Sequence, residues 1–233
     1  MKTKIFCDSA DFKTIKKLNN NPLVAGFTTN PSLMRLAGAK NYKNYSLKIL
    51  SVCKKKPISF EVFADSSKDM IRQGLIITKW GKNVYVKIPV CNSKGKFMGK
   101  VIQKLNSSNI KLNITAVYSS NQTKEILKKI NNKTKVIISI FAGRMADVGK
   151  DPIPEIKKSI TIAKKFKNVE ILWASVREPY NFLQAKELKC SIITIPPSII
   201  EKIEKFGKTF KKLTTDTVKG FLEDSKKSNF KIN

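Results

Sequence analysis

Residues 83–90 of this chain read Asn83-Val84-Tyr85-Val86-Lys87-Ile88-Pro89-Val90, and the interpretation of the whole sequence starts from them. The apolar, β-branched residues on both sides of Lys87 predict a strand that is covered on both faces. Removing a charged amine from water is costly, so a buried Lys87 must be paired or must lose its proton through a depressed pKa. Such an amine can attack a carbonyl and form a Schiff base. The alternative is that Lys87 closes an edge strand and points at water.

The length and composition of the chain favour one large α/β domain with a well-buried core, covering all 233 residues. No apolar run of about eighteen residues predicts a membrane span, and the first four residues lead straight into a strand without a secretory signal. The four cysteines are scattered, which favours reduced thiols and a cytoplasmic location over disulfides or zinc. Histidine is absent, so we expect no His-ligated metal and no imidazole catalyst.

The charge balance is strongly basic, with 46 Lys and Arg against 17 Asp and Glu and a formal net charge of +29. Such a balance raises the alternative of a non-catalytic binder of nucleic acid or phosphate. The lysines are, however, spread over nearly every predicted helix and form no dense basic tail, which favours lysine-coated amphipathic helices. Nucleic acid is therefore not the expected partner.

Apolar runs with strand character recur about every 25 residues, as in a compact (β/α)8 TIM barrel. They cover Lys4–Ser9, Leu23–Phe27, Ile58–Val62, Asn83–Val90, Ile110–Thr115, Lys135–Phe141, Val169–Ala174 and Cys190–Ile195. An open doubly wound sheet is the alternative, but it usually has fewer strands and a glycine-rich nucleotide turn. The stretch Gly95–Lys100 has the wrong glycine spacing for a phosphate loop, and Val101 stands where Ser or Thr is needed. An extra helix, at residues 215–227, is predicted beyond the eighth unit.

Polar residues cluster at or just beyond the carboxyl ends of these strands, where the active sites of such barrels lie. They are Asp8, Thr28, Asn30, Glu61, Lys87, Asn113, Thr115, Ser139, Arg144, Ser175 and Arg177. Helix capping explains many polar residues at strand ends, but it explains Glu61 and Lys87 poorly, because apolar residues flank both.

Carbonyl–amine chemistry suits this set of side chains. Lys87 would attack a ketose carbonyl, and Glu61 and Asp8 are the acid/base candidates in a chain without histidine. Arginine occurs only four times, and Arg144 and Arg177 both fall where a phosphate commonly binds in barrels. The alternative is that these two arginines merely pair with Asp147 and Glu178.

Several motifs, in order along the chain, resemble the transaldolase family, in its short single-barrel branch that includes fructose-6-phosphate aldolase. They are the opening strand with Asp8, Thr28-Thr29-Asn30-Pro31-Ser32, Val86-Lys87-Ile88-Pro89, Asn113-Ile114-Thr115, Phe141-Ala142-Gly143-Arg144 and Ala174-Ser175-Val176-Arg177. The resemblance runs from about residue 4 to residue 225. It implies a metal-free, cofactor-free Schiff-base transfer of a dihydroxyacetone unit between sugar phosphates. The reaction implied converts sedoheptulose 7-phosphate and glyceraldehyde 3-phosphate to erythrose 4-phosphate and fructose 6-phosphate, in the non-oxidative pentose phosphate pathway.

Site roles follow from the resemblance residue by residue. Lys87 would form the Schiff base, Glu61 would be the acid/base acting through a water, and Asp8 would handle the proton of the hydroxyl whose loss triggers cleavage. Thr115 would complete the catalytic set by holding that water. The substrate would be held by Thr28, Asn30, Asn113, Ser139 and Phe141, and its phosphate by Arg144, Ser175 and Arg177.

Two positions separate the activities within this branch. The aldolase type resembles a site with glutamine in the third strand and tyrosine in the sixth, whereas this chain has Glu61 and Phe141. A tyrosine hydroxyl would help water to protonate the enamine and release free dihydroxyacetone. The sequence thus favours transaldolase, with the free-aldolase activity as the alternative. Cys7 and Ala142 depart from the family pattern, but neither replaces a catalytic group.

The predicted helix at residues 215–227 carries Val218, Phe221 and Leu222 on one stripe, which must be buried somewhere. It could fold back across its own barrel. In the short branch of the family the terminal helix instead reaches a neighbouring subunit, and the resemblance implies a ring-based homo-oligomer, a pentamer-based decamer.

Overall fold

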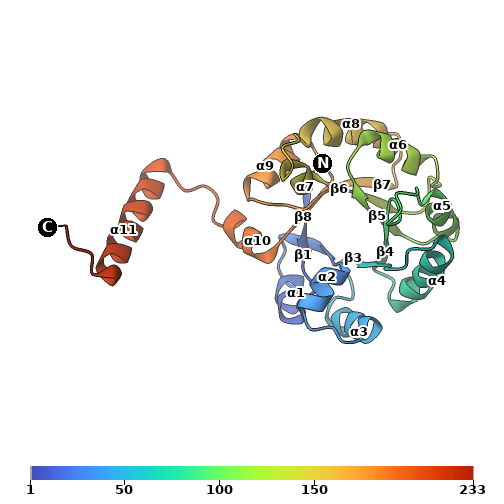
Figure 1. Cartoon of the computed structure of the whole chain (residues 1–233), viewed down its shortest axis with the longest axis horizontal. Helices are drawn as coiled ribbons and strands as arrows, with labels where there is room; N and C mark the ends of the chain where they lie inside the picture. Colours follow the sequence, from blue (N-terminus) through green and yellow to red (C-terminus); the bar gives the residue numbers. More distant parts are fainter. Residues whose placement is uncertain (1, 233) are drawn as a thin grey trace. The chain divides into compact units, whose positions relative to one another are not determined.

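The computed structural model describes residues 2–232 of the chain. The chain separates into two compact units, Met1–Ile200 and Glu201–Asn233. The first unit is a closed barrel of eight parallel strands that follow one another in chain order (Figure 1). This confirms the predicted (β/α)8 fold. The strands are β1 (Lys4–Asp8), β2 (Val24–Thr28), β3 (Ile58–Glu61), β4 (Val84–Pro89), β5 (Leu112–Val117), β6 (Val136–Phe141), β7 (Val169–Ala174) and β8 (Ile192–Ile195).

Helices follow each strand and surround the barrel (Figure 1). Two helices connect β2 to β3. The helical elements up to the boundary of the first unit are α1 (Phe12–Asn19), α2 (Pro31–Leu36), α3 (Tyr42–Val52), α4 (Ser67–Ile77), the 3₁₀ helix η1 (Thr78–Trp80), α5 (Gly99–Ser107), α6 (Ser120–Leu127), α7 (Ala142–Ala146), α8 (Ile153–Ala163), α9 (Tyr180–Glu187) and α10 (Pro197–Ile203).

The start of α2 is set by local chemistry that the sequence predicts. Asn30 is extended, with φ −155° and ψ 166°, and its side chain accepts a hydrogen bond from the Leu33 backbone N–H. Pro31 occupies the first turn, where its missing N–H costs little. Asn30 is thereby fixed at the carboxyl end of β2, beside the mouth of the barrel.

The side chains inside the barrel change from apolar to polar along each strand. Residues two apart on a strand share a face. An apolar cluster inside the barrel, nearer the amino ends of the strands, contains Phe6, Tyr85, Ile137, Leu172 and Ile192. The residues two positions further on are Asp8, Lys87, Ser139, Ala174 and Thr194, and all five line one cavity. The apolar layer therefore supports a mostly polar layer, which lies nearer the carboxyl ends of the strands.

Strand register brings three of the predicted site residues to the same height. Glu61 on β3 pairs with Lys87 on β4, and Lys87 pairs with Asn113 on β5. β4 has a strand on each side, so the alternative that Lys87 closes an edge strand is wrong.

The second unit contains α11 (Phe210–Ser228). The predicted start at residue 215 was five residues too late. Thr209 caps the helix by accepting a hydrogen bond from the Lys212 backbone N–H, and Asp216 pairs with Lys208 at 2.8 Å and with Lys212 at 2.9 Å. These contacts stabilise the first turns of α11. The helix forms there although Thr214 and Thr215 are β-branched and Gly207 lies just before the cap. No residue of α11 is buried.

Candidate active site

A cavity of about 230 Å³ lies at the carboxyl ends of the strands. It is lined by ten of the twelve residues that the sequence predicts for the site: Asp8, Thr28, Asn30, Lys87, Thr115, Ser139, Phe141, Arg144, Ser175 and Arg177. The other two, Glu61 and Asn113, do not line the cavity but contact Lys87 and Ser139, which do. The cavity wall also includes Ala174, Val176, Thr194 and Pro196, which the sequence-based prediction did not include.

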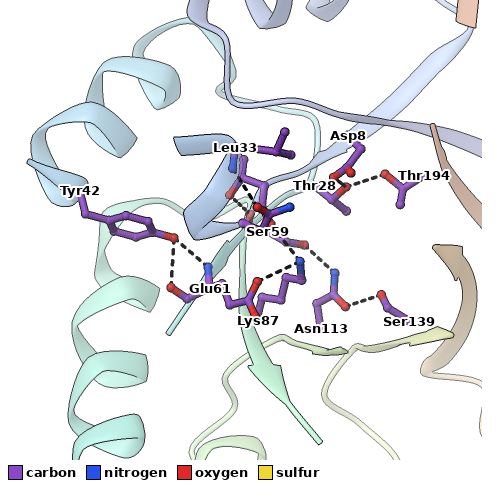
Figure 2. A network of polar contacts seen from close by, with 12 residues as sticks. Asp8, Thr28, Leu33, Tyr42, Ser59, Glu61, Lys87, Asn113, Ser139 and Thr194 are labelled. Atoms are coloured by element: carbon purple, nitrogen blue, oxygen red, sulfur yellow. Dashed lines mark hydrogen bonds and ion pairs between the residues drawn. The ribbon is translucent and has the colours of Figure 1, made fainter. Parts of the chain in front are cut away.

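Lys87 is buried and paired. Its side chain is 8% exposed, and its Nζ lies 3.0 Å from Glu61 Oε2 and donates a 3.0 Å hydrogen bond to the Thr29 carbonyl (Figure 2). The sequence indicated that a buried Lys87 amine must either pair with another group or lose its proton. The structure shows that it is paired with Glu61. Removing one partner of such a buried pair costs several kcal/mol, roughly 3–5, because the remaining charge is left uncompensated. The pair thus places a carboxylate next to an amine that faces the cavity.

The backbone of Glu61 is held by Tyr42, a residue of α3. The Tyr42 hydroxyl accepts a 2.9 Å hydrogen bond from the Glu61 N–H and donates a 3.0 Å hydrogen bond to the Glu61 carbonyl (Figure 2). Burial raises the pKa of Tyr42 well above its usual value, so the phenol stays neutral and can do both. The sequence reasoning missed Tyr42, because nothing in its helix signals a contact with a strand end 19 residues away.

Asp8 belongs to a chain of three side chains on the neighbouring strands β8, β1 and β2. Thr28 Oγ1 donates a 2.6 Å hydrogen bond to Asp8 Oδ1 and lies 2.5 Å from Thr194 Oγ1 (Figure 2). Burial raises the pKa of Asp8, whereas the charge of Lys87 and the hydrogen bond from Thr28 act to lower it. A carboxyl group with a raised pKa is suited to accepting and returning a proton.

A second hydrogen-bonded chain orients the polar groups of the middle strands. Ser139 Oγ donates to Asn113 Oδ1 at 2.7 Å, and Asn113 Nδ2 donates to Ser59 Oγ at 3.0 Å. Thr115 differs from these residues, because its buried hydroxyl has no hydrogen-bond partner among residues 2–232. Buried polar groups are usually paired, so an unpaired hydroxyl in a cavity wall is suited to binding a substrate or a water.

The end of β7 approaches α7 unusually closely. Ser175 has φ 63°, in the left-handed region, and its carbonyl would lie 1.7 Å from a Cβ added to Gly143. Only glycine fits at position 143, therefore, and the strained Ser175 lies in the cavity wall. Strain of this kind at a cavity is a common feature of functional sites.

Phe141 and Arg144 form another part of the wall. The Arg144 guanidinium lies 5.8 Å from the centre of the Phe141 ring, and the Tyr118 ring meets the Phe141 ring edge-on at 5.9 Å. These contacts place an apolar ring, without a hydroxyl, at the carboxyl end of β6.

Arg177 faces the cavity but is paired with Asp147. Its Nε lies 2.9 Å from Asp147 Oδ1 and its Nη2 lies 2.5 Å from Oδ2. The pairing considered from the sequence is therefore present for Arg177, and it holds the pKa of Asp147 below its usual range. Both side chains are about half exposed, at 49% and 47%, and exposed ion pairs of this kind contribute little to stability. A phosphate can therefore compete with Asp147 for Arg177 at little cost.

Within residues 2–232, no group of three His, Cys, Asp or Glu side chains is arranged to hold a metal ion. In the same residues, no helix is long and apolar enough to cross a membrane.

Residues 5–233 match the model of the family described as Transaldolase/Fructose-6-phosphate aldolase. A protein of Herpetosiphon aurantiacus named "Probable transaldolase" is 32% identical over 213 residues, which are 91% of this chain and 92% of that protein. One of the same name from Thermoplasma volcanium is 35% identical over 227 residues, which are 96% of each chain.

Solved structures of similar shape share the barrel but little sequence. Orotidine 5'-monophosphate decarboxylase from Metallosphaera sedula matches with a TM-score of 0.55 and 12% identity, over 87% of this chain and 95% of that chain. The flavin-binding domain of baker's yeast flavocytochrome b2 also gives 0.55 and 12%, over 84% of this chain and 56% of that chain. At this identity the likeness shows the fold alone.

Proposed function

The chain belongs to the transaldolase/fructose-6-phosphate aldolase family, and we propose that within it the protein is a transaldolase that works through a Schiff base on Lys87. The observation that carries the proposal is the buried Lys87 amine in the cavity wall, 3.0 Å from the Glu61 carboxylate. A buried lysine with an adjacent base is the arrangement that nucleophilic catalysis by an amine requires.

In the proposed first half-reaction, Glu61 takes a proton from the Lys87 ammonium, and the neutral amine attacks the carbonyl carbon of the ketose phosphate. The attacking nitrogen passes a second proton to the new alkoxide, which gives the carbinolamine. Glu61 then returns the first proton, through a water, to the carbinolamine hydroxyl, which leaves as water as the iminium forms. Asp8 then accepts the proton of the C4 hydroxyl, and the C3–C4 bond breaks with its electron pair moving toward the iminium nitrogen. An aldehyde phosphate leaves, and a dihydroxyacetone enamine remains bound to Lys87. The second half-reaction reverses these steps with another aldehyde.

The other residues of the cavity would position the substrate. The hydroxyl of Thr115 has no hydrogen-bond partner within the described chain, so we assign it to hold the catalytic water. Thr28, Asn30, Asn113 and Ser139 would hold the sugar hydroxyls. Arg144, Ser175 and Arg177 would hold the phosphate, because a planar guanidinium matches phosphate oxygens in pairs.

The choice of transfer over release rests on Glu61 and Phe141. Without a hydroxyl at position 141, water near the enamine has one donor fewer, so the enamine awaits an aldehyde acceptor. The proposal is tested by incubating the purified protein with fructose 6-phosphate, with and without erythrose 4-phosphate. We expect sedoheptulose 7-phosphate and glyceraldehyde 3-phosphate only when both substrates are present. Free dihydroxyacetone without an acceptor would instead support the aldolase alternative.

A non-catalytic binder of nucleic acid or phosphate is the alternative of another class, prompted by the net charge of +29. It predicts that Glu61→Gln leaves binding intact and that affinity for nucleic acid falls steeply with salt. The ion pair of Glu61 with Lys87 argues against it, since binding a polyanion has no use for a carboxylate paired with the lysine of the cavity wall.

The proposal extends to assembly, compartment and pathway. We place the protein in the non-oxidative pentose phosphate pathway in the cytoplasm, as one barrel domain per subunit. The exposed α11 residues Val218, Phe221 and Leu222 support docking of this helix on a neighbouring subunit of a pentamer-based ring.

A further inference from the structure

Thr194 is a buried residue of the cavity wall whose hydroxyl is close to the hydroxyl of another strand. It lies on β8, is 4% exposed and has Phe6 of β1 as its register neighbour. Thr28 lies on β2, with Asp8 of β1 as its register neighbour. The hydroxyls of β8 and β2 therefore meet across β1, at 2.5 Å, on the inner side of the barrel.

The directions of the hydrogen bonds in this chain are set by counting protons. An ionised carboxylate can only accept, and a threonine hydroxyl has one proton. The proton of Thr28 is used on Asp8 Oδ1, at 2.6 Å. The contact between the two threonines can then be a hydrogen bond only if Thr194 donates to Thr28.

The same count identifies the oxygen of Asp8 that is free to react. Oδ1 accepts from Thr28, whereas Oδ2 has no hydrogen-bond partner among residues 2–232. A hydroxyl that itself accepts a hydrogen bond is a stronger donor, because successive bonds polarise one another. The contact with Thr194 should therefore strengthen the bond from Thr28 to Oδ1 and help to keep the carboxylate in one orientation.

We infer that Thr194 is a positioning residue of the active site: by donating to Thr28, it fixes the Thr28 proton on Asp8 Oδ1 and leaves Oδ2 to exchange a proton with the substrate. The inference about substrate rests on the proposed function, in which Asp8 takes the proton of the C4 hydroxyl. The step is balanced, because that proton passes to Oδ2 on cleavage and returns to the new hydroxyl when the acceptor aldehyde adds.

Other ionisable groups lie around Asp8, and a variant that tests Thr194 must leave them unchanged. β2 and β8, its two strand neighbours, present the hydroxyls of Thr28 and Thr194. The charged or titratable groups of the surroundings are the amine of Lys87 with its partner Glu61, the arginines 144 and 177 of the same cavity, and the adjacent Cys7 thiol. Burial, with Asp8 beside it, raises the pKa of Cys7 to about 12, so this thiol stays neutral at working pH.

The test is the titration of Asp8 in the whole protein. Aspartate carboxyl carbons are labelled with ¹³C, and the Asp8 signal is identified by its loss in Asp8→Asn. Thr194→Val removes the hydroxyl at nearly constant volume, which weakens stabilisation of the charged form. We expect the Asp8 titration midpoint to rise by about 0.5–1 pH unit in Thr194→Val and to return in Thr194→Ser. The acidic limb of kcat/KM for transfer should move upward by the same amount.

Thr123 provides the matched control, because its buried hydroxyl also pairs with a hydroxyl, that of Ser159 at 2.9 Å, but between α6 and α8. Thr123→Val should leave the Asp8 midpoint in place. An unchanged midpoint in folded Thr194→Val overturns the inference. If Thr194→Val does not fold, Thr194→Ala is measured with the same criterion. Absence of transfer in the unmodified protein, together with the expected shift in the midpoint, would refute the proposed function and leave the hydrogen-bond chain standing.

Discussion

Arg177 holds both carboxylate oxygens of Asp147, at 2.9 Å from Nε and 2.5 Å from Nη2, while it also lines the cavity above Lys87. The pair has the two-point geometry with which a guanidinium binds phosphate. Asp147 thus occupies the position on Arg177 that we propose for the substrate phosphate, and binding of that phosphate would exchange one anion for another.

Removing Arg177 tests its role in phosphate binding. We expect Arg177→Ala to raise KM for fructose 6-phosphate about 10–100-fold, a loss of about 1.5–3 kcal/mol for a charge-assisted contact. Unphosphorylated dihydroxyacetone should be affected much less, because it offers nothing to the guanidinium. Steady-state kinetics with the two donors measure the difference. Arg72→Ala is the control, since Arg72 forms a similar exposed pair with Asp69 away from the cavity.

Removing the charge of Asp147 should have the opposite effect. In Asp147→Asn the guanidinium loses its competing anion, so KM for phosphorylated donors should fall about 2–5-fold, a small change because the pair is exposed. Equal kinetics in Asp147→Asn and the unmodified protein would show that this pair does not compete with phosphate.

Phe141→Tyr should change the outcome of the reaction. A hydroxyl added at the carboxyl end of β6 supplies a donor for water near the enamine, so release of free dihydroxyacetone from fructose 6-phosphate should rise while transfer falls. An enzymatic assay for dihydroxyacetone without an acceptor measures the change. Tyr118→Phe, which alters the ring packed edge-on against Phe141, is the control for altered packing alone.

Asp8 should destabilise the fold in its ionised form. Its pKa is raised in the folded protein, so the folded state binds a proton more tightly than the unfolded state does. The free energy of unfolding should then fall as the pH rises from the unfolded pKa, about 3.9, through the folded value. Asp8→Asn removes the ionised carboxylate and should raise Tm at pH 7 by about 2–4 °C, corresponding to about 1 kcal/mol. Thermal unfolding at several pH values measures this.

The same substitution should abolish most of the transfer activity, by about 10²–10⁴-fold for a lost acid/base group. The gain in Tm of Asp8→Asn over the unmodified protein should shrink toward pH 4, because the Asp8 carboxyl of the unmodified protein then also becomes uncharged. A variant that is less stable than the unmodified protein at pH 7 would contradict the account of Asp8.

The two-residue alternation of the strands explains why so much of the site was predictable. Lys87 and Glu61 stand out because each interrupts an apolar run, and parallel register must bring such positions together. Tyr42 and Thr194 could not be found in this way. Tyr42 acts from a helix, and Thr194 meets Thr28 across 166 residues of chain, a contact that exists only once the barrel has closed.

The boundary of α11 shows another limit of reading the sequence. The helix was predicted to begin at residue 215, after a connection that contains Gly207, but the Thr209 cap and the two lysine pairs of Asp216 stabilise helix from Phe210 onward. Several local contacts together outweighed the individual propensities of Thr214 and Thr215.

The exposed face of α11 leads to a prediction about assembly. Deleting residues 209–233 should convert a ring-based oligomer to smaller species, because the apolar stripe around Phe221 and Leu222 would be lost from subunit contacts. Light scattering at physiological salt gives the mass of both proteins. A full-length protein that is already monomeric would contradict the proposed oligomer.

Trapping the intermediate tests the central claim most directly. The protein is incubated with fructose 6-phosphate, reduced with borohydride, digested and mapped by mass spectrometry. The account predicts one stable adduct, on the peptide that contains Lys87, and its absence in Lys87→Arg, since arginine stays protonated and cannot attack a carbonyl. Lys111→Arg, a change at the start of β5 away from the cavity, should keep the adduct. An adduct on another lysine, or none in the unmodified protein, would contradict the assignment of Lys87 as the nucleophile.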